Sequence, residues 1–295
     1  MSADLPPPLT IGEVCDWALK LPSSPAILPQ LGSALLQTEG TAGEIERIIR
    51  LDSALAAATL RLSNSASCGA GREIDSLEHA IVMLGHREIY RIASQSLLSR
   101  WETAHQETLP WEPGEYARHS LCTAIAAEAI AEASGSGDPQ IAYTAGLVCD
   151  LGKLALAFTC APYYPGISAH ARRADGTWAE AERFVLGFDQ TQVGARLLRA
   201  WRFPESFARA VELQLQPADS PPELVPLVAQ LHAARFLAVS LGAGVTEGGF
   251  RFTLHGNFLT AQGFTADFLE RALLEVQERA TLRLAGGLSH GRLPA

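Results

Sequence analysis

The sequence predicts an all-α fold, and three observations support this prediction. Apolar residues recur at helical spacing along nearly the whole chain, beginning with the run over residues 11–18. Capping boxes, in which Thr or Asp is followed three residues later by Glu or Gln, precede several of these runs. Alternating strand patterns are nearly absent, and the short stretch 248–254 is interpreted as a loop between helices.

The helix starts follow in chain order from these signals. The capping pairs are Thr10/Glu13, Thr41/Glu44, Thr177/Glu180 and, more loosely, Asp189/Gln192. Asp138 and Pro139 supply an N-cap and a first-turn proline before the apolar segment 141–158. A further helix is expected over about 115–133, and two longer helices over about 223–241 and 265–284, with a glycine-rich loop between them.

Two proline-containing breaks divide the chain into three predicted parts. The stretch 105–114 holds two prolines and few aliphatic residues, and 216–222 holds three prolines. We therefore expect an N-terminal helical bundle over residues 1–109, a central helical part over 110–216, and a C-terminal helical extension over 217–295.

Composition and charge exclude several classes of protein. Hydrophobic residues make up 47% of the chain, which is enough to bury a core. Lys and Arg number 23 against 32 Asp and Glu, a net charge of −9, which argues against a nucleic-acid surface. No signal peptide and no uncharged apolar run of eighteen residues are found, so no membrane span is expected. Five cysteines without a CxxC pair fit reduced thiols, so we expect a cytoplasmic protein.

The central part holds the residues that could carry chemistry. His119 lies early in one predicted helix, and Asp150 follows about thirty residues later, with Cys149 before it and Lys153 after it. An imidazole and carboxylates that converge from neighbouring helices can hold a divalent metal, which polarises a phosphate oxygen and lowers the pKa of a bound water.

A series of short motifs runs through two-thirds of the chain in a characteristic order. The motifs are Leu21-Pro22 with Pro25, Asp52-Ser53-Ala54-Leu55, Leu60-Arg61-Leu62-Ser63-Asn64-Ser65-Ala66, Ala80-Ile81 with Leu84-Gly85, Arg118-His119-Ser120, Ala145-Gly146-Leu147, Asp150-x-Gly152-Lys153, Val193-Gly194-Ala195 and Trp201-x-x-Pro204. From Leu21 to about Gln216 the chain thereby resembles the HDOD family, the HD-related output domains of bacterial signalling proteins. The resemblance implies an N-terminal bundle of short helices packed on a degenerate HD-domain-like helical bundle, with C-terminal helices beside it and usually without catalysis.

The departures from the HD pattern bear on the metal. Cys149 stands where HD enzymes have His, Gln190 follows Asp189 where relatives often have Asp-His, and Gln214 and Gln216 stand where relatives often carry a His-His pair. Neutral amides are poor ligands for Zn, Fe or Mn. We therefore expect no metal and no other cofactor.

If an ion were held, its ligands would be His119, Asp150 and Asp189. A thiolate at Cys149 would favour a softer zinc site.

Each candidate also has a purely structural interpretation. His119 is expected to hydrogen-bond a carbonyl or Asp150, and Asp150 to form a local i,i+3 pair with Lys153. Cys149 is interpreted as a small buried apolar residue and Gly152 as a site of close helix packing. The family-motif residues with structural roles are Asn64, Ser65 and Gly85. The dispersed tryptophans are interpreted as core or interface anchors.

Three functions follow from these residues. The first is a non-catalytic regulatory module that binds a partner protein in a bacterial signalling pathway. The alternative is a cryptic metal-dependent phosphohydrolase or a nucleotide-binding sensor, with Lys153 holding phosphate beside the remnant HD site. A third is an anion or nucleic-acid contact through Arg196, Arg199 and Arg202, which the acidic net charge opposes and which is otherwise a solvated helix face. The oligomeric state stays open, a homo-oligomer included.

Overall fold

A computed structural model describes residues 9–20, 42–50, 53–67, 74, 76–104, 109–174 and 176–288. Within these ranges the chain is helical and has no strand, which confirms the predicted all-α fold. The elements are α1 (Ile11–Lys20), α3 (Ala42–Arg50), α4 (Ser53–Ser67), α5 (Leu77–Ala104), α6 (Glu115–Ser134), α7 (Pro139–Val148), α8 (Leu151–Thr159), η2 (Ala161–Tyr163), α9 (Tyr164–Ala174), α10 (Trp178–Leu186), α11 (Gln190–Ala200), α12 (Glu205–Leu213), η3 (Pro217–Asp219), α13 (Val225–Ser240), α14 (Thr246–Gly249), α15 (Gly256–Ala261) and α16 (Ala266–Leu288).

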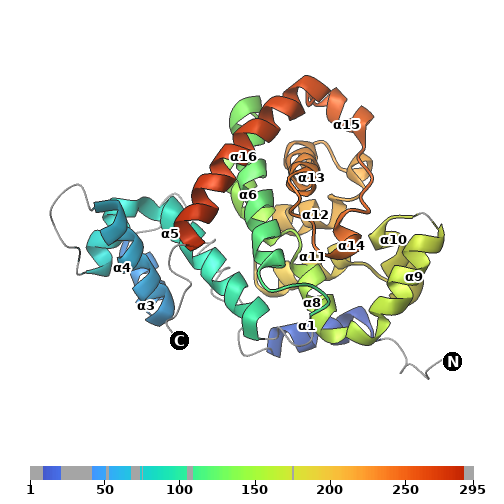
Figure 1. The fold of residues 1–295 in the computed structure, drawn as a ribbon, viewed down its shortest axis with the longest axis horizontal. Coiled ribbons are helices and arrows are strands. Elements are labelled where there is room, and N and C mark those ends of the chain that lie inside the picture. Colours follow the sequence, from blue (N-terminus) through green and yellow to red (C-terminus); the bar gives the residue numbers. More distant parts are fainter. Residues whose placement is uncertain are drawn as a thin grey trace.

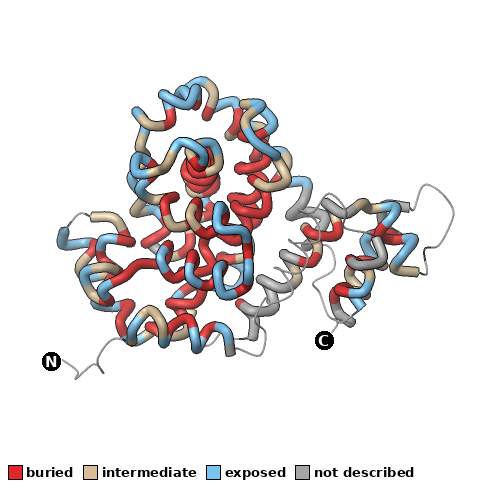
Figure 2. The backbone as a smooth tube through the Cα atoms, turned by 180° about the vertical axis from the view of Figure 1, so that it is seen from behind, coloured by how far each residue is buried: buried red, intermediate tan, exposed pale blue. Residues whose placement is uncertain are grey.

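The buried apolar side chains of the described residues form two separate clusters. The larger cluster joins α1 with the helices from α6 onwards, and the smaller one joins α3, α4 and α5. Figure 1 shows α3 and α4 at the outer end of the long α5, away from the larger body. In Figure 2 the buried residues are concentrated inside that larger body. The three-part division at residues 109 and 216 stays a prediction, because these clusters do not test its boundaries.

The predicted helix starts agree well with the structure. Thr10 and Glu13 form their capping box, with the Thr10 N–H 2.8 Å from Glu13 Oε2. The boxes at Thr177 and Asp189 are also complete, and Asp138 accepts the Gln140 N–H at 2.7 Å. Thr41 lies outside the described residues, although α3 begins directly after it.

The structure differs from the prediction at two places. The expected helix over 141–158 is broken at Cys149 and Asp150 into α7 and α8. Continuous apolar character hides this break, because both helices are buried on most sides. The glycine-rich region between α13 and α16 holds two short helices, α14 and α15, in addition to loops.

Helix α6 is the central element of the larger body. It packs against α7, α13 and α16, and fourteen of its side chains are buried. Its N-terminus is capped by Glu102 of α5, whose Oε1 accepts the N–H groups of Gly114 and Tyr116 at 3.1 Å each. Further along α6, the buried Glu128 forms an ion pair with Arg91 of α5. A carboxylate at each position thus fixes α5 against α6.

The family-motif residues have visible local roles. Asn64 of α4 donates through Nδ2 to Ile74 O at 2.8 Å and accepts the Ile74 N–H at 2.7 Å, so its side chain fixes the segment that precedes α5. Gly85 interrupts α5 with φ of 74°, a left-handed conformation that glycine adopts without steric cost. Ser65 lies in α4, but its side chain is outside the described part of the chain.

The tryptophans and the most apolar stretch have different environments. Trp111, Trp178 and Trp201 are buried, whereas Trp17 on α1 is exposed. The side chain of Trp101 is outside the described part. The stretch Pro139–Thr159 is long and apolar enough to cross a membrane, but 89% of its most apolar window is buried inside the protein. This burial is that of a core segment.

Candidate functional site

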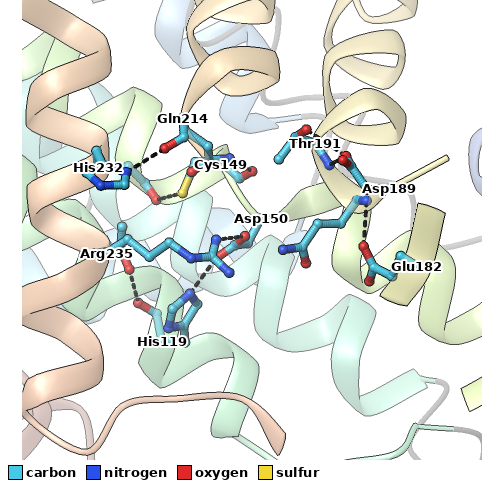
Figure 3. A network of polar contacts seen from close by, with 12 residues as sticks. His119, Cys149, Asp150, Glu182, Asp189, Thr191, Gln214, His232 and Arg235 are labelled. Carbon is cyan, nitrogen blue, oxygen red and sulfur yellow. Dashed lines mark hydrogen bonds and ion pairs between the residues drawn. The ribbon is translucent and has the colours of Figure 1, made fainter. Parts of the chain in front are cut away.

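The candidate site is centred on Asp150, at the break between α7 and α8. Its side chain makes no capping bond to α8 and lies in the interior, 2% exposed. His119 Nε2 contacts one carboxylate oxygen, and Arg235 Nη1 of α13 donates to the other. Figure 3 shows the three side chains meeting from three different helices or helix ends. Both oxygens of the carboxylate are therefore engaged by basic groups.

His119 is fully buried and makes contacts through both ring nitrogens. Its Nδ1 lies 2.6 Å from the carbonyl oxygen of Ala243, and its Nε2 faces Asp150. Burial lowers the pKa of His119, and the carboxylate of Asp150 opposes this. A carbonyl oxygen and an ionised carboxylate both only accept, so the neutral imidazole donates to one of them and only the imidazolium donates to both. The sequence interpretation named a carbonyl or Asp150 as the partner, and the structure has both.

The charge of Asp150 is set by its neighbours. Burial by itself raises the pKa of a carboxylic acid, but Arg235, Lys153 and His119 outweigh it, so the pKa of Asp150 lies well below its usual range. Asp150 is therefore ionised at neutral pH, inside a cluster that is rich in basic groups.

Lys153 lies in the first turn of α8 and is also buried. Burial lowers the pKa of Lys153 to about 8. Its Nζ has no hydrogen-bond partner among the described residues, and it forms no ion pair with Asp150 there. The local i,i+3 pair expected from the sequence is replaced by the contact with Arg235, which comes from α13.

A second buried acid, Glu182 of α10, lies near Lys153. Its Oε2 accepts the Gln190 N–H at 2.8 Å, and its Oε1 has no partner among the described residues. Burial raises the pKa of Glu182 to about 8, and Lys153 acts in the opposite direction. Glu182 is therefore largely protonated at neutral pH.

Asp189 is turned away from this cluster, towards its own helix. Its Oδ1 accepts the Thr191 N–H at 2.8 Å, and its Oδ2 pairs with Arg183. No hydrogen bond or ion pair joins it to Asp150 in the described part of the chain. Asp189 is thus the N-cap of α11.

Cys149 and Gln214 complete the polar network. Cys149 Sγ donates to Gly146 O at 3.2 Å, and burial raises the pKa of its thiol well above the usual value. Gln214 Nε2 donates to Cys149 O at 2.8 Å. His232 Nδ1 donates to Gln214 O at 2.8 Å, while its Nε2 accepts the His255 N–H at 3.0 Å.

The donor set does not fit a bound metal. Asp150 is neutralised by Arg235, the thiol of Cys149 retains its proton, and Asp189 serves a helix end. Among the described residues, no group of three or more His, Cys, Asp or Glu side chains could hold an ion. A guanidinium thus supplies the positive charge beside Asp150.

Gly152 brings α8 and α11 into close contact. A methyl group at this position would lie 1.8 Å from Gln190 O and 2.6 Å from Gly194 N. Only glycine is compatible with this approach, which places the start of α8, with Asp150 and Lys153, directly beside the start of α11.

The arginines of the third hypothesis lie elsewhere. Arg199 is 37% exposed and donates to Glu205 and Glu212. Arg199 is thus paired locally, and Arg196 and Arg202 are also exposed, as is typical of solvated surface charges.

Sequence reasoning did not single out Arg235, Glu182 or Gln190 as site residues. The available signal for Arg235 was a charge inside the otherwise apolar segment 225–240, since a buried arginine needs an acidic partner. No comparable signal distinguishes Glu182 from the exposed acids of the same region.

Comparisons with known proteins agree with this architecture. The family model described as HDOD domain matches residues 21–217. An HDOD domain protein with unknown function from Geobacter sulfurreducens has a TM-score of 0.64 at 19% identity, covering 92% of this chain and 98% of its own. A comparison with curated proteins finds no match.

Two further solved structures share the fold. A candidate phosphohydrolase from Shewanella amazonensis SB2B has a TM-score of 0.66 at 21% identity, covering 92% of this chain and 94% of its own. A candidate signal transduction protein from Marinobacter aquaeolei VT8 has a TM-score of 0.72 at 22% identity, and the match covers 93% of this chain and 61% of that one. At these levels of sequence identity, the structural similarity shows a shared fold.

Proposed function

This chain belongs to the HDOD family, and from that premise we propose that it is a non-catalytic regulatory module of cytoplasmic signal transduction, which acts by binding a partner protein. The observation that carries this proposal is the contact of Arg235 with Asp150. A metal-dependent phosphohydrolase needs a carboxylate that is free to bind its ion. Here a permanently charged guanidinium is bound to that carboxylate, and both side chains are at least 97% buried.

The surface supports a binding role. Trp17 on α1 and Phe184 on α10 are 61% and 72% exposed, and such large apolar side chains are typical anchors of protein interfaces. The partner would be a component of the signalling pathway in which this module acts.

The alternative is the metal-dependent phosphohydrolase or nucleotide sensor. Its support is the fold shared with the candidate phosphohydrolase of Shewanella amazonensis. The residues around Asp150 oppose it, because the ligand set is incomplete and the carboxylate is already paired.

Metal content and hydrolysis distinguish the two functions. Full-length protein purified without chelator is incubated with Mn²⁺ or Zn²⁺, desalted and analysed for bound metal, and its turnover of bis(p-nitrophenyl) phosphate is measured. We expect less than one-tenth of an ion per chain, and turnover equal to that of the Asp150→Ala variant. One ion per chain together with hydrolysis that Asp150→Ala abolishes would overturn the proposal.

Partner binding is tested separately with the immobilised chain. We expect a specific protein to be retained from a lysate of the native host. Its affinity for the chain should fall at least tenfold in the Trp17→Ser or Phe184→Ser variant. The matched control is Leu274→Ser, a change at another exposed apolar residue, on α16. Retention of no protein above background would count against the binding role.

A further inference from the structure

A small cavity opens beside Arg235, on the side of the site formed by α10 and the segment 248–255. Its volume is about 240 Å³, and its walls come from α10, the start of α11, the residues that follow α12, α13 and that segment. Pockets for drug-sized ligands range over roughly 300–1,000 Å³, so this cavity suits a smaller molecule.

Two deeply buried polar side chains line the cavity and have atoms without a partner. Gln190 is 2% exposed and Arg235 is 3% exposed. The Oε1 of Gln190 and the Nε of Arg235 make no hydrogen bond within the described residues. Native proteins pair nearly all buried polar atoms. These two atoms have almost no accessible surface themselves, so a molecule in the cavity would meet the side-chain amide nitrogen of Gln190 and the terminal nitrogens of Arg235.

Basic side chains predominate among the charged groups of the lining. Arg183, Arg235 and Arg251 all contribute. Arg183 and Arg235 each use one Nη1 on a carboxylate, and Arg251 Nη1 donates to the neutral carbonyl of Ala171 at 3.1 Å. Because a guanidinium carries five N–H donors, the contacts of Arg183 and Arg235 leave donors for a ligand.

Glu180, the acidic side chain of the lining, is hydrogen-bonded at the start of its own helix. Glu180 Oε2 accepts both the N–H and the hydroxyl of Thr177, at 2.7 and 2.8 Å. Behind the cavity, Asp150 is surrounded by Arg235, Lys153 and His119. The charge distribution therefore favours an anion.

Backbone contacts hold the walls in place. The Trp178 N–H donates to Arg251 O at 3.4 Å, and the His255 N–H donates to His232 Nε2 at 3.0 Å. A methyl group on Gly248 would lie 2.4 Å from the Trp178 ring, so the segment 248–255 is packed closely on α10. The lining is thus positioned before any ligand arrives, which reduces the entropic cost of binding.

We propose that this cavity binds a small phosphorylated molecule, with the phosphate held by Arg183, Arg235 and Arg251 and a further ligand oxygen accepting from the Gln190 side-chain amide. Phosphate fits because several of its oxygens accept at once from guanidinium groups. The further oxygen follows from Gln190, whose side chain lines the cavity and whose amide nitrogen is a donor. This site needs neither a metal nor a protein partner, so its failure would leave the proposed function intact.

The test uses the full chain and three probes at constant ionic strength. Inorganic phosphate, glycerol 3-phosphate and glycerol are titrated by isothermal calorimetry and by thermal unfolding. We expect saturable binding of glycerol 3-phosphate at one site per chain, weaker binding of phosphate, and none of glycerol. Absence of saturable binding by both phosphate probes, or equal stabilisation by glycerol, would overturn the proposal.

Variants assign the binding to this cavity. Arg251→Gln and Gln190→Leu should each weaken glycerol 3-phosphate binding at least tenfold. Gln190→Leu removes an unpaired buried oxygen, so its unfolding temperature without ligand should not fall, and this separates loss of binding from loss of fold. The control Arg61→Gln removes the same charge from an exposed position on α4 and should leave the affinity unchanged. Equal affinity in all three variants would refute the assignment.

Discussion

Asp150→Asn should be among the most destabilising single substitutions in this chain. The variant keeps the side-chain shape but removes the negative charge between His119 and Arg235. The guanidinium of Arg235 cannot lose its proton in this range of pH, and it is 3% exposed, so its charge is left buried without a counter-ion. Breaking a buried pair in this way costs about 3–5 kcal/mol.

The opposite substitution should cost less. In Arg235→Met, Asp150 keeps His119 as a partner and Lys153 as a neighbouring positive charge. We expect a loss of about 1–3 kcal/mol for this variant. In the double variant neither charge remains, so it should be more stable than the sum of the single effects predicts, by about 2 kcal/mol.

Urea unfolding at pH 7, followed by far-ultraviolet circular dichroism, measures the free energy of unfolding of the unmodified chain, the two single variants and the double variant. Equal slopes against urea concentration would show that the native and unfolded states keep their compactness. Arg199→Met is the matched control, because it removes a surface arginine that pairs with Glu205, and it should cost less than about 1 kcal/mol. A loss below about 1 kcal/mol in Asp150→Asn, or strictly additive effects in the double variant, would refute the role given to this ion pair.

Three further predictions concern the surrounding core. The pKa of Glu182 is raised to about 8, so its contribution to stability is complete below the unfolded value near 4.5 and is lost as the pH rises towards 8. Glu182→Gln should therefore reduce the loss of unfolding free energy between pH 5 and 8 by about 2 kcal/mol or more; an unchanged profile would contradict this. Gly152→Ala should lower the free energy of unfolding, measured by chemical denaturation, by about 3 kcal/mol or more, because the new methyl group meets the backbone of α11. The control Gly166→Ala, whose new methyl group has its nearest atom at 4.0 Å, should change this free energy by less than about 1 kcal/mol. The four described cysteines are buried. In a Cys68→Ser variant, Ellman's reagent should therefore modify none of them within minutes at pH 8 until urea unfolds the chain. Rapid modification of the native protein would contradict their burial.

The local part of this fold was predictable from the sequence. Helix starts depend on residues three positions apart, so the boxes at Thr10, Thr177 and Asp189 could be identified directly. The pairing of His119 with Asp150 also followed, because a buried histidine needs an acceptor and the resemblance placed both on adjacent helices.

The partner of Asp150 could not be predicted in the same way. Arg235 lies 85 residues further along the chain, and no periodicity shows which helix returns to the carboxylate. Asp189 was included among the candidate ligands because of its motif position, yet the same residue satisfies a helix N-terminus. The sequence spacing is compatible with Asp189 as a metal ligand and with Asp189 as a helix N-cap. In the structure it is the N-cap, and it also contacts Arg183.

The cap that Glu102 places on α6 limits how the chain can be divided. Its two carboxylate oxygens receive the Trp111 indole N–H and the backbone N–H groups of Gly114, Tyr116 and Ala117. A fragment that begins at residue 110 would lose all four acceptor contacts at the end of the helix that carries His119. A shortened protein intended for structural or binding experiments should therefore begin before α5, so that the helix keeps the residue that starts it.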